Sequence, residues 1–304
     1  MIDSPTVTCH EILTGLRRLG VQPGMRLMVH SSLSSFGTVD GGARSVIAAL
    51  IEAVTPIGLL LMPSFNHYAP FRRGGPGIYD PATTPTTNGL IPETFRTMHG
   101  AWRSLNPSHA YACLGNDAED LLSHHHLTLT MGPDSPLGRL GREGGYCLML
   151  GTDYHTNTYK HVVETTLGSP CLGRRTLALP VRLPDSRVVR LRTWTFRASP
   201  CPIMDPVEYA EREMSRRGLH RRTQVGNARL TLFRLSDCFE VFEEMLRGGH
   251  AGHPPCSRCP IRPGVGPGQV TSDWDDVAGR LKDGAEARGI GPMAYCLSVS
   301  RRRR

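Results

Sequence analysis

The sequence predicts an α/β protein whose central sheet is mostly parallel and flanked by helices, with a smaller subdomain that contains a β-hairpin. Apolar runs of strand length alternate with amphipathic stretches of helix length, and polar, glycine-bearing loops follow several of these strands. After about residue 170 the pattern changes to alternating, strand-like segments. We therefore expect one domain over residues 1–304, with the minor subdomain at about 170–268.

The first 62 residues predict the order helix, strand, helix, strand. Thr8 and Glu11 form a capping box at the start of the first helix, and apolar residues follow it at helical spacing. Buried strands are expected at 25–29 and 58–62, with an amphipathic helix at 46–54 between them. Parallel pairing of the two strands is favoured because a helix connects them.

The same alternation continues to about residue 165. A long loop at 64–88 comes first, and its length indicates a binding role. The elements expected next are a helix from about 91, a strand at 110–114, a helix at 117–122, a strand at 146–150 and a helix at 157–165.

The hairpin is predicted by two alternating segments, 176–183 and 188–196, on either side of the turn-forming residues 184–187. The remaining expectations are a helix at 205–216, a strand at 230–235, a helix at 239–247, a Gly/Pro-rich loop at 248–268, a helix capped near Ser272 and a strand at 294–299.

The net charge is +8, and residues 300–304 form a basic tail that we expect to be solvated. A second basic cluster is expected at a helix end or turn and consists of Arg216, Arg217, Arg221 and Arg222. Neither cluster has the interleaved aromatic residues of a nucleic-acid surface, so a nucleic-acid partner is not expected. An excess of positive charge does suit an anionic ligand such as a nucleotide phosphate.

We expect a cytoplasmic protein without a membrane partner, because no secretory signal and no apolar run of membrane-spanning length is visible. The nine cysteines are an odd number, which argues against a disulfide framework. His124, His125 and His126 could suggest metal binding, but a solvated loop is the better interpretation, since no cysteine lies near them in the sequence.

The first candidate site follows the first predicted strand and spans residues 30–37. Its small hydroxyl residues precede a helix at the carboxyl end of a parallel strand, where ligand crevices form. Such residues can offer donors to a phosphate or a carbonyl. An ordinary serine-rich turn is the alternative. The segment is not a G-x-x-x-x-G-K-[ST] loop, so ATP or GTP chemistry is disfavoured.

The second candidate site is His161 with Glu164, which share one helix face at i,i+3 spacing. A carboxylate beside an imidazole can orient it and raise its pKa, which gives a base that is usable near neutral pH. The alternative is a surface His–Glu pair.

These segments occur within a spaced set of motifs that resembles the aminoglycoside 3-N-acetyltransferase family. The order and spacing match from about residue 10 to 170. The motifs are V-H-S-S-L-S-S-F-G, T-P-I-G-L-L-L-M-P-S, Y-D-P-A-T-T-P, R-S-L-N-P-S-H-A-Y-A-C-L-G, D-S-P-L-G-R-L and L-G-T-D-Y-H-T-N-T-Y-K-H-V-V-E.

The resemblance implies transfer of an acetyl group from acetyl-CoA to an amine, on the α/β fold of that family. It implies that His161 is the general base, supported by Glu164, and that Thr158 positions the thioester or the oxyanion. The residues that it places near coenzyme A are His30, Ser31, Ser32, Ser34, Phe36, Gly37, Arg103 and Ser104. The partners expected are coenzyme A and a small-molecule amine; the sequence does not indicate an oligomeric state.

Two departures from the family's pattern concern the acceptor. Asn106 replaces a histidine, and the second hairpin strand has no carboxylate where the family supplies acidic residues. Asp205 and Glu208 could fill that role. Otherwise the acceptor is another natural-product amine, with a different acyl-CoA as a further option. A catalytically silent relative that binds coenzyme A is the third hypothesis, and the presence of His161 and Glu164 argues against it.

Cys256 and Cys259 form a C-x-x-C in the Pro/Gly-rich loop, which is half of a zinc site. We expect Cys171 and Cys201 to complete a structural, four-cysteine zinc site, with His253 as an alternative ligand. An H-P-P followed by C-x-x-C also resembles the apramycin-resistance branch of the family. The alternative is two free thiols. A redox pair is disfavoured, since no thioredoxin-like context surrounds the motif.

Overall fold

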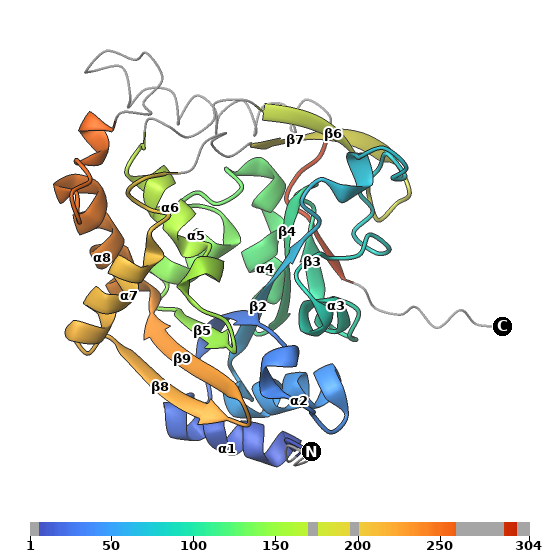
Figure 1. Ribbon diagram of the computed structural model, residues 1–304. Coiled ribbons are helices and arrows are strands. Elements are labelled where there is room, and N and C mark those ends of the chain that lie inside the picture. The colour runs from blue at the N-terminus through green and yellow to red at the C-terminus, as the bar shows by residue number, and fades with distance from the viewer. Residues whose placement is uncertain (1–5, 170–175, 195–200, 260–288, 297–304) are drawn as a thin grey trace.

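The computed structural model describes residues 6–169, 176–194, 201–259 and 289–296. Its main feature is a sheet of eight strands in the order β10-β3-β4-β2-β1-β5-β9-β8 (Figure 1). These strands are β1 (Arg26–Ser31), β2 (Leu59–Phe65), β3 (Trp102–Ser104), β4 (His109–Gly115), β5 (Tyr146–Leu150), β8 (His220–Val225), β9 (Ala228–Arg234) and β10 (Ala294–Cys296). A separate hairpin consists of β6 (Thr176–Arg182) and β7 (Val188–Trp194).

Parallel pairing occurs only at the centre of the sheet, where β1 lies between β2 and β5. The other five pairings within the described part of this sheet are antiparallel, so the α/β class is confirmed and the prediction of a mostly parallel sheet is wrong. Short connections explain part of this difference. The link from β8 to β9 is only Gly226 and Asn227, and two residues can join strands only in antiparallel order.

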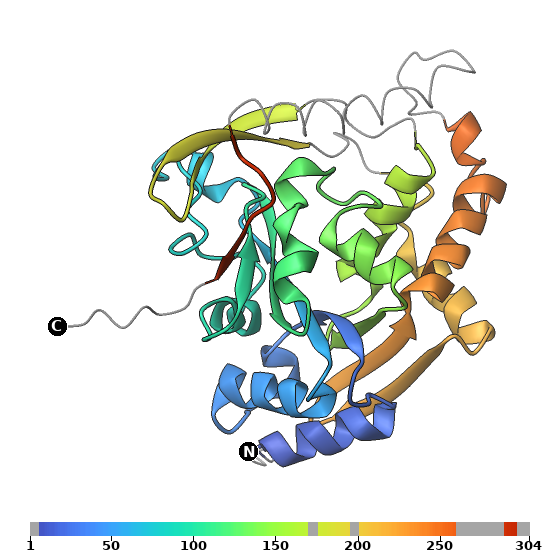
Figure 2. The ribbon, with the colours of Figure 1, turned by 180° about the vertical axis from the view of Figure 1, so that it is seen from behind.

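Helices cover both faces of the sheet (Figures 1 and 2). Three pack on one face: α1 (Cys9–Leu19), α2 (Gly42–Val54) and α3 (Leu90–Arg96). Five pack on the other: α4 (Ala118–Ser123), α5 (Pro136–Arg142), α6 (Tyr159–Thr166), α7 (Val207–Arg216) and α8 (Leu235–Gly248). Alternate residues of the central strands enter the two cores, as Met28 and Leu27 of β1 do, because successive side chains of a strand point to opposite faces.

The first helix forms as the sequence predicts. Thr8 accepts a hydrogen bond from the Glu11 backbone, and the Glu11 carboxylate accepts one from the backbone of Thr8, so the capping box is confirmed. Gly20 ends the helix with φ of 96°, a left-handed conformation that glycine adopts without strain. Ile12 and Leu16 face the sheet and are fully buried.

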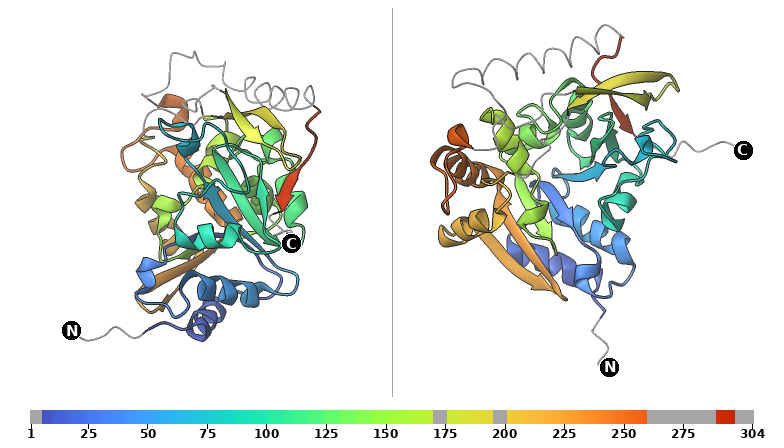
Figure 3. Two further views of the ribbon diagram at one scale, coloured as in Figure 1. Left: turned by 90° about the vertical axis from the view of Figure 1, so that its right-hand side faces the viewer. Right: turned by 45° about the horizontal axis from the view of Figure 1, so that its top comes forward.

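The hairpin forms as predicted. β6 and β7 form a two-stranded ribbon apart from the main sheet (Figure 3). They cover a small core of their own, which includes Tyr79 and Leu105. In contrast, β9 pairs with β5 and extends the main sheet. β8 was not expected, because residues 220–225 are mostly polar; as an edge strand, it exposes Arg221 and Arg222.

Within the described residues, no helix is both long and apolar enough to cross a membrane. The helix expected near Ser272 and the basic tail at 300–304 lie outside the described residues.

Candidate active site

The side chains of His161 and Glu164 meet on α6, as their spacing predicts. Nδ1 of His161 lies 2.8 Å from Oε2 of Glu164. The glutamate side chain is fully buried, whereas that of His161 is 20% exposed. A carboxylate at Nδ1 holds the proton on that nitrogen, so the lone pair of the neutral ring is on Nε2. The pair can therefore act as an oriented base with a buried carboxylate behind it.

The start of α6 is fixed by the residues that precede the pair. The Asn157 side chain accepts a hydrogen bond from the backbone of Tyr159 and donates one to the Cys238 thiol. The Tyr159 ring packs so closely on Gly141 that a β-carbon at that position would lie 2.2 Å from the tyrosine oxygen. These contacts hold the first turn of the helix against α5 and α8.

Thr158, one turn before His161, has a hydroxyl that is buried and has no hydrogen-bond partner among the described residues. The hydroxyl of Tyr111, on β4, is also buried and has no hydrogen-bond partner among the described residues. Burial raises the pKa of Tyr111, and the nearby Thr158 hydroxyl acts in the opposite direction. The two hydroxyls do not form a hydrogen bond of normal geometry. Since buried polar groups in proteins are nearly always paired, Thr158 suits a group supplied by a ligand or a water.

A cluster of rings lies beside His161. The ring of His109 is 5.3 Å from that of His67, 5.8 Å from that of Tyr68 and 5.0 Å from that of Phe65. Burial lowers the pKa of His109 to about 3, and the charges of His67 and His161 act in the same direction. His109 is therefore neutral at physiological pH.

His67 and Tyr68 are consecutive non-glycine residues with φ of 44° and 64°. This left-handed region is unfavourable for side chains with a β-carbon, and such strain concentrates at functional sites. Asn66 supports the turn: its side chain accepts a hydrogen bond from Tyr68 and donates one to the Pro107 carbonyl. The imidazole of His67 is then placed 2.6 Å from the Thr87 hydroxyl.

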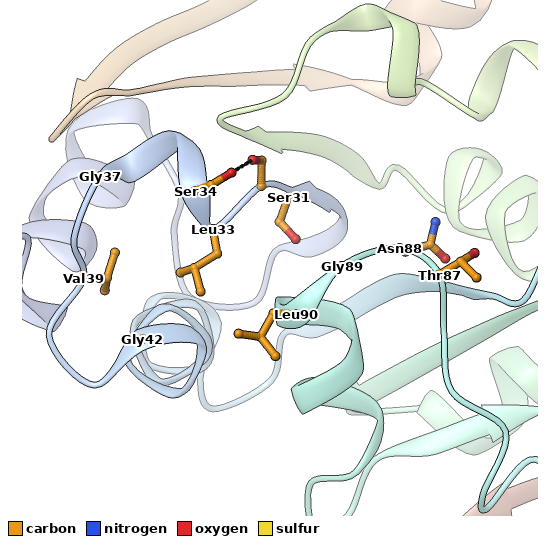
Figure 4. Close-up of a pocket in the computed structure, with 11 residues that line it drawn as sticks. Ser31, Leu33, Ser34, Gly37, Val39, Gly42, Thr87, Asn88, Gly89 and Leu90 are labelled. Carbon is orange, nitrogen blue, oxygen red and sulfur yellow. Dashed lines mark hydrogen bonds between the residues drawn. The ribbon is translucent and has the colours of Figure 1, made fainter.

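A cavity of about 690 Å³ opens at the carboxyl ends of the parallel strands. The loop after β1 forms one side and the segment before α3 forms the other (Figure 4). The lining residues are Ser31, Ser32, Leu33, Ser34, Gly37, Val39, Gly42, Thr87, Asn88, Gly89 and Leu90. Since β1 and β5 are neighbouring parallel strands, this loop and the start of α6 lie at the same edge of the sheet.

Hydroxyl groups and bare backbone border the cavity. The Ser31 hydroxyl is buried and has no partner among the described residues, and Figure 4 shows it pointing into the space between the two sides. The hydroxyls of Ser32 and Ser34 lie 3.3 Å apart. Gly42 and Gly89 have positive φ values, and a β-carbon would meet nothing within 4 Å at either position, so the backbone itself borders open space.

Four of the six residues expected near coenzyme A in this loop line the cavity: Ser31, Ser32, Ser34 and Gly37. The other two do not. Phe36, in the 3-10 turn η1 (Ser34–Phe36), is 1% exposed and packs in the core beneath the loop. His30 is buried within β1, and burial lowers its pKa to about 4.

Arg103 and Ser104, which were also expected near coenzyme A, are not among the residues that line the cavity. Both side chains are fully buried and bind groups of the protein. Arg103 donates to three backbone carbonyls. The Ser104 hydroxyl lies 2.8 Å from Nδ1 of His125 and accepts a hydrogen bond from the Tyr111 backbone.

Sequence reasoning missed the other side of the cavity, Thr87–Leu90. The length of the 64–88 loop did indicate binding, and the T-N-G sequence before a helix was the available local signal. It also missed what Asn106 does. Its buried side-chain oxygen accepts hydrogen bonds from the backbones of Ser108 and His109, which fixes the turn that presents the His109 ring.

The prediction of a solvated loop at residues 124–126 is wrong. His125 and His126 are each 1% exposed. Nε2 of His125 lies 2.9 Å from the Thr130 carbonyl oxygen, and Nε2 of His126 lies 3.1 Å from that of Gly291. Burial lowers the pKa of both residues to about 4, so they are neutral rings with carbonyl partners.

Asp205 and Glu208, the acidic residues considered for the acceptor, both pair with basic groups near α6. Asp205 lies 3.1 Å from the Lys160 ammonium group, and Glu208 lies 3.1 Å from Nε2 of His155.

Cys201, Cys256 and Cys259 are buried in one core cluster, and burial raises the pKa of Cys256 to about 11. Among the described residues, no three histidine, cysteine or acidic side chains are grouped so that they could hold a metal ion. The described geometry therefore does not support the expected zinc site. The fourth expected ligand, Cys171, lies outside the described residues.

The buried His–Glu pair beside a polar cavity suits an enzyme that removes a proton from a bound substrate, and comparison with known proteins identifies the acyltransferase family. The family profile described as aminoglycoside 3-N-acetyltransferase matches residues 28–247. A curated relative, aminoglycoside N(3)-acetyltransferase III of Salmonella sp, is 32% identical over 252 residues, which is 76% of this chain and 88% of that protein. The chain belongs to the aminoglycoside 3-N-acetyltransferase family.

Solved structures agree with this assignment. The structure titled "AAC-IIIb binary with CoASH" has a TM-score of 0.71 at 25% identity and covers 83% of this chain and 100% of its own. The structure titled "AAC-VIa bound to Sisomicin" has a TM-score of 0.70 at 28% identity and covers 81% of this chain and 100% of its own.

Proposed function

We propose that this protein transfers an acetyl group from acetyl-CoA to an amino group of an aminoglycoside, with His161 as general base. The observation that carries the proposal is the 2.8 Å contact between His161 and the fully buried Glu164, at the same sheet edge as a cavity that fits coenzyme A. The family supports the reaction, and the titles of related structures name coenzyme A and an aminoglycoside as bound ligands.

When bound, acetyl-CoA supplies an acetyl thioester, which an amine can attack directly. His161 takes a proton from the amine as its nitrogen bonds to the acetyl carbon, and returns that proton to the sulfur as the C–S bond breaks. Glu164 keeps the imidazole oriented and balances the charge that the ring gains. The Thr158 hydroxyl, which is otherwise unpartnered, donates to the oxygen that becomes negative in the transition state.

Ser31, Ser32 and Ser34 hold the cofactor from one side of the cavity, and Thr87 and Asn88 hold it from the other. A chain of contacts leads from the cavity towards the base. Thr87 bonds to His67, whose ring contacts that of His109. His109 in turn interacts electrostatically with His161.

A second candidate acceptor is a natural-product amine of lower positive charge. The described strand β7 favours it, since Arg190 and Arg192 lie there and residues 188–194 contain no carboxylate. A test for both is the release of free thiol from acetyl-CoA with a panel of amines, including an aminoglycoside such as sisomicin. Release with the aminoglycoside supports the first proposal, release only with other amines supports the second, and no release with any amine contradicts both.

The cytoplasmic location and the structural zinc stay predictions. For the metal, analysis of untagged protein should find about one zinc per chain if Cys171, Cys201, Cys256 and Cys259 form a closed site. In that case, Cys256→Ser should lower the melting temperature more than it lowers turnover of the folded enzyme. Metal-free protein of unchanged stability would remove zinc and leave the acyltransferase proposal intact.

A further inference from the structure

Arg103 is a buried cation on β3, close to the cofactor cavity but not part of its lining. Arg103 is 0% exposed. Among the described residues, no carboxylate lies within ion-pair distance of its guanidinium group. The positive charge is met by backbone carbonyls and by the face of Tyr79, whose ring centroid is 5.3 Å from the guanidinium carbon. A buried charge is costly, so an arginine held in this way needs a reason beyond filling space.

The three carbonyls that Arg103 binds come from two separate parts of the chain. Nη2 donates to the Ser64 carbonyl at 3.0 Å, on the buried strand β2. Nη1 donates to the carbonyls of Pro81 at 3.0 Å and Thr84 at 2.6 Å, in the loop between β2 and α3. Because the guanidinium group is rigid and planar, it fixes the loop relative to the strand.

The part of this loop at residues 80–89 is a wall between two cavities. Thr87, Asn88 and Gly89 line the cofactor cavity. On the other side lies a second cavity of about 520 Å³, lined among others by Asp80, Thr84 and again Thr87. Thr83, Pro85 and Thr87 of the wall are exposed, so polar contacts to neighbouring segments contribute to holding its position.

Two residues of α3 supply further contacts to the wall. Arg96 donates to the Ala82 carbonyl at 3.1 Å, and the Glu93 carboxylate accepts a hydrogen bond from the Thr86 backbone at 2.8 Å. Arg96 and Glu93 also form an ion pair with each other. The wall also bonds to β2 directly, since the Thr86 and Thr87 hydroxyls donate to the Phe65 carbonyl and the Asn88 side chain accepts from the Phe65 backbone. Arg103 is distinct because it holds the other end of the wall, at Pro81 and Thr84, to strand β2 at the Ser64 carbonyl.

We propose that Arg103 is a positioning residue for coenzyme A, acting through the wall at residues 80–89. It does not touch the ligand; it sets where Thr87 and Asn88 meet it. This inference rests on the proposed function, since it takes the cavity to be the cofactor site. It explains why an arginine that was expected to contact the cofactor is found beneath the cavity instead.

The test compares Arg103→Lys with the unmodified protein. Lysine keeps the charge, but its single nitrogen cannot span carbonyls on both segments as the guanidinium fork does. The Kd of coenzyme A by calorimetry and the KM for acetyl-CoA should each rise by about tenfold, the effect typical of outer-shell positioning groups. At saturating acetyl-CoA, kcat should be nearly unchanged, because only cofactor binding is lost.

Arg96→Lys is the second variant, and it should shift the same two constants in the same direction by a smaller factor. Arg18→Lys is the matched control. Arg18 also donates to a carbonyl, that of Gln224 at 2.8 Å, but it joins α1 to β8 and should leave both constants unchanged. A lower melting temperature for Arg103→Lys, with Kd and KM unchanged, would show a purely structural arginine and overturn the inference.

Two other results are also decisive. If Arg103→Lys does not fold, Arg96→Lys decides, and unchanged cofactor constants in that variant contradict the positioning role of the wall. If the unmodified protein binds no coenzyme A, the proposed function fails together with the inference. Binding in the unmodified protein with no change in either variant contradicts the inference alone.

Discussion

Nδ1 of His161 lies 2.8 Å from Oε2 of Glu164, one turn further along α6, and the glutamate is completely buried. An exposed pair elsewhere in the chain has similar chemistry, since Nε2 of His155 lies 3.1 Å from Glu208, but there both side chains are more than half exposed. Burial therefore distinguishes the two pairs, so the effect of removing each carboxylate on kcat can be compared directly.

Glu164→Gln should lower kcat by at least about tenfold, and by no more than the 10²–10⁴-fold that general-base catalysis contributes. The amide keeps the volume but loses the charge that supports the protonated ring. The measurement is steady-state thiol release at saturating substrates. Glu208→Gln is the control and should keep kcat at saturating substrates, whatever its effect on the KM of the acceptor. An equal fall of kcat in both variants would contradict a special role for the buried pair.

Ser32→Trp should prevent cofactor binding, because the indole would occupy the cavity that Ser32 borders. In the unmodified protein, coenzyme A at 100 times its Kd should stabilise the native state by about 2.7 kcal/mol, which raises the melting temperature. That shift should disappear in Ser32→Trp and persist in Ser215→Trp, which places the same ring on the exposed face of α7. A full shift in Ser32→Trp would mean that coenzyme A binds elsewhere.

Thr158→Val should lower kcat by about 10²–10³, the usual effect of removing one oxyanion donor. Stability should stay the same or rise slightly, because valine replaces a buried hydroxyl that has no partner among the described residues. Tyr111→Phe removes the neighbouring unpartnered hydroxyl and should likewise not destabilise the fold. Undiminished kcat in Thr158→Val, from the same thiol-release assay, would exclude the threonine from the reaction.

The free energy of unfolding should fall as the pH decreases from about 6.5 towards 4. Burial lowers the pKa of His30 and His125 to about 4 and that of His109 to about 3, whereas the unfolded chain titrates near 6.5. In that window the unfolded state binds more protons, so the stability present above pH 6.5 is lost on acidification. For His125 the loss is about 3 kcal/mol, at 1.36 kcal/mol for each unit of pKa.

Urea denaturation at several pH values measures this dependence. His125→Asn removes one of the titrating rings, so its unfolding free energy should fall less steeply with acid than that of the unmodified protein. A free energy that is constant between pH 7.5 and 5 would contradict the neutral, buried state of these histidines.

Local sequence patterns were enough for the elements that position the site. The continuous apolar runs at β1, β2 and β5 predicted the central parallel strands, and the i,i+3 spacing of His161 and Glu164 predicted their contact. Both are properties of short segments. The helix period brings residues three apart to one face wherever the helix lies.

Features that depend on distant segments could not be predicted in this way. Residues 220–225 are polar and become β8 only because β9 offers an edge with which to pair. Arg103 and His125 have charged or polar side chains that usually indicate exposure, but both are buried. Arg103 binds carbonyls of Ser64, Pro81 and Thr84, and His125 contacts the Ser104 hydroxyl as well as the nearby Thr130 carbonyl. A single sequence does not reveal which carbonyls will be near, so their burial was missed.

The most direct test of the central claim is the kcat of His161→Ala, with acetyl-CoA and an aminoglycoside as substrates and acetylated product detected by mass spectrometry. The account predicts a fall of about 10²–10⁴ in kcat, since a general base is lost. The Kd of coenzyme A should be nearly unchanged, because His161 is not among the residues that line the cavity. A variant that binds coenzyme A normally and turns over at the rate of the unmodified protein would contradict the account.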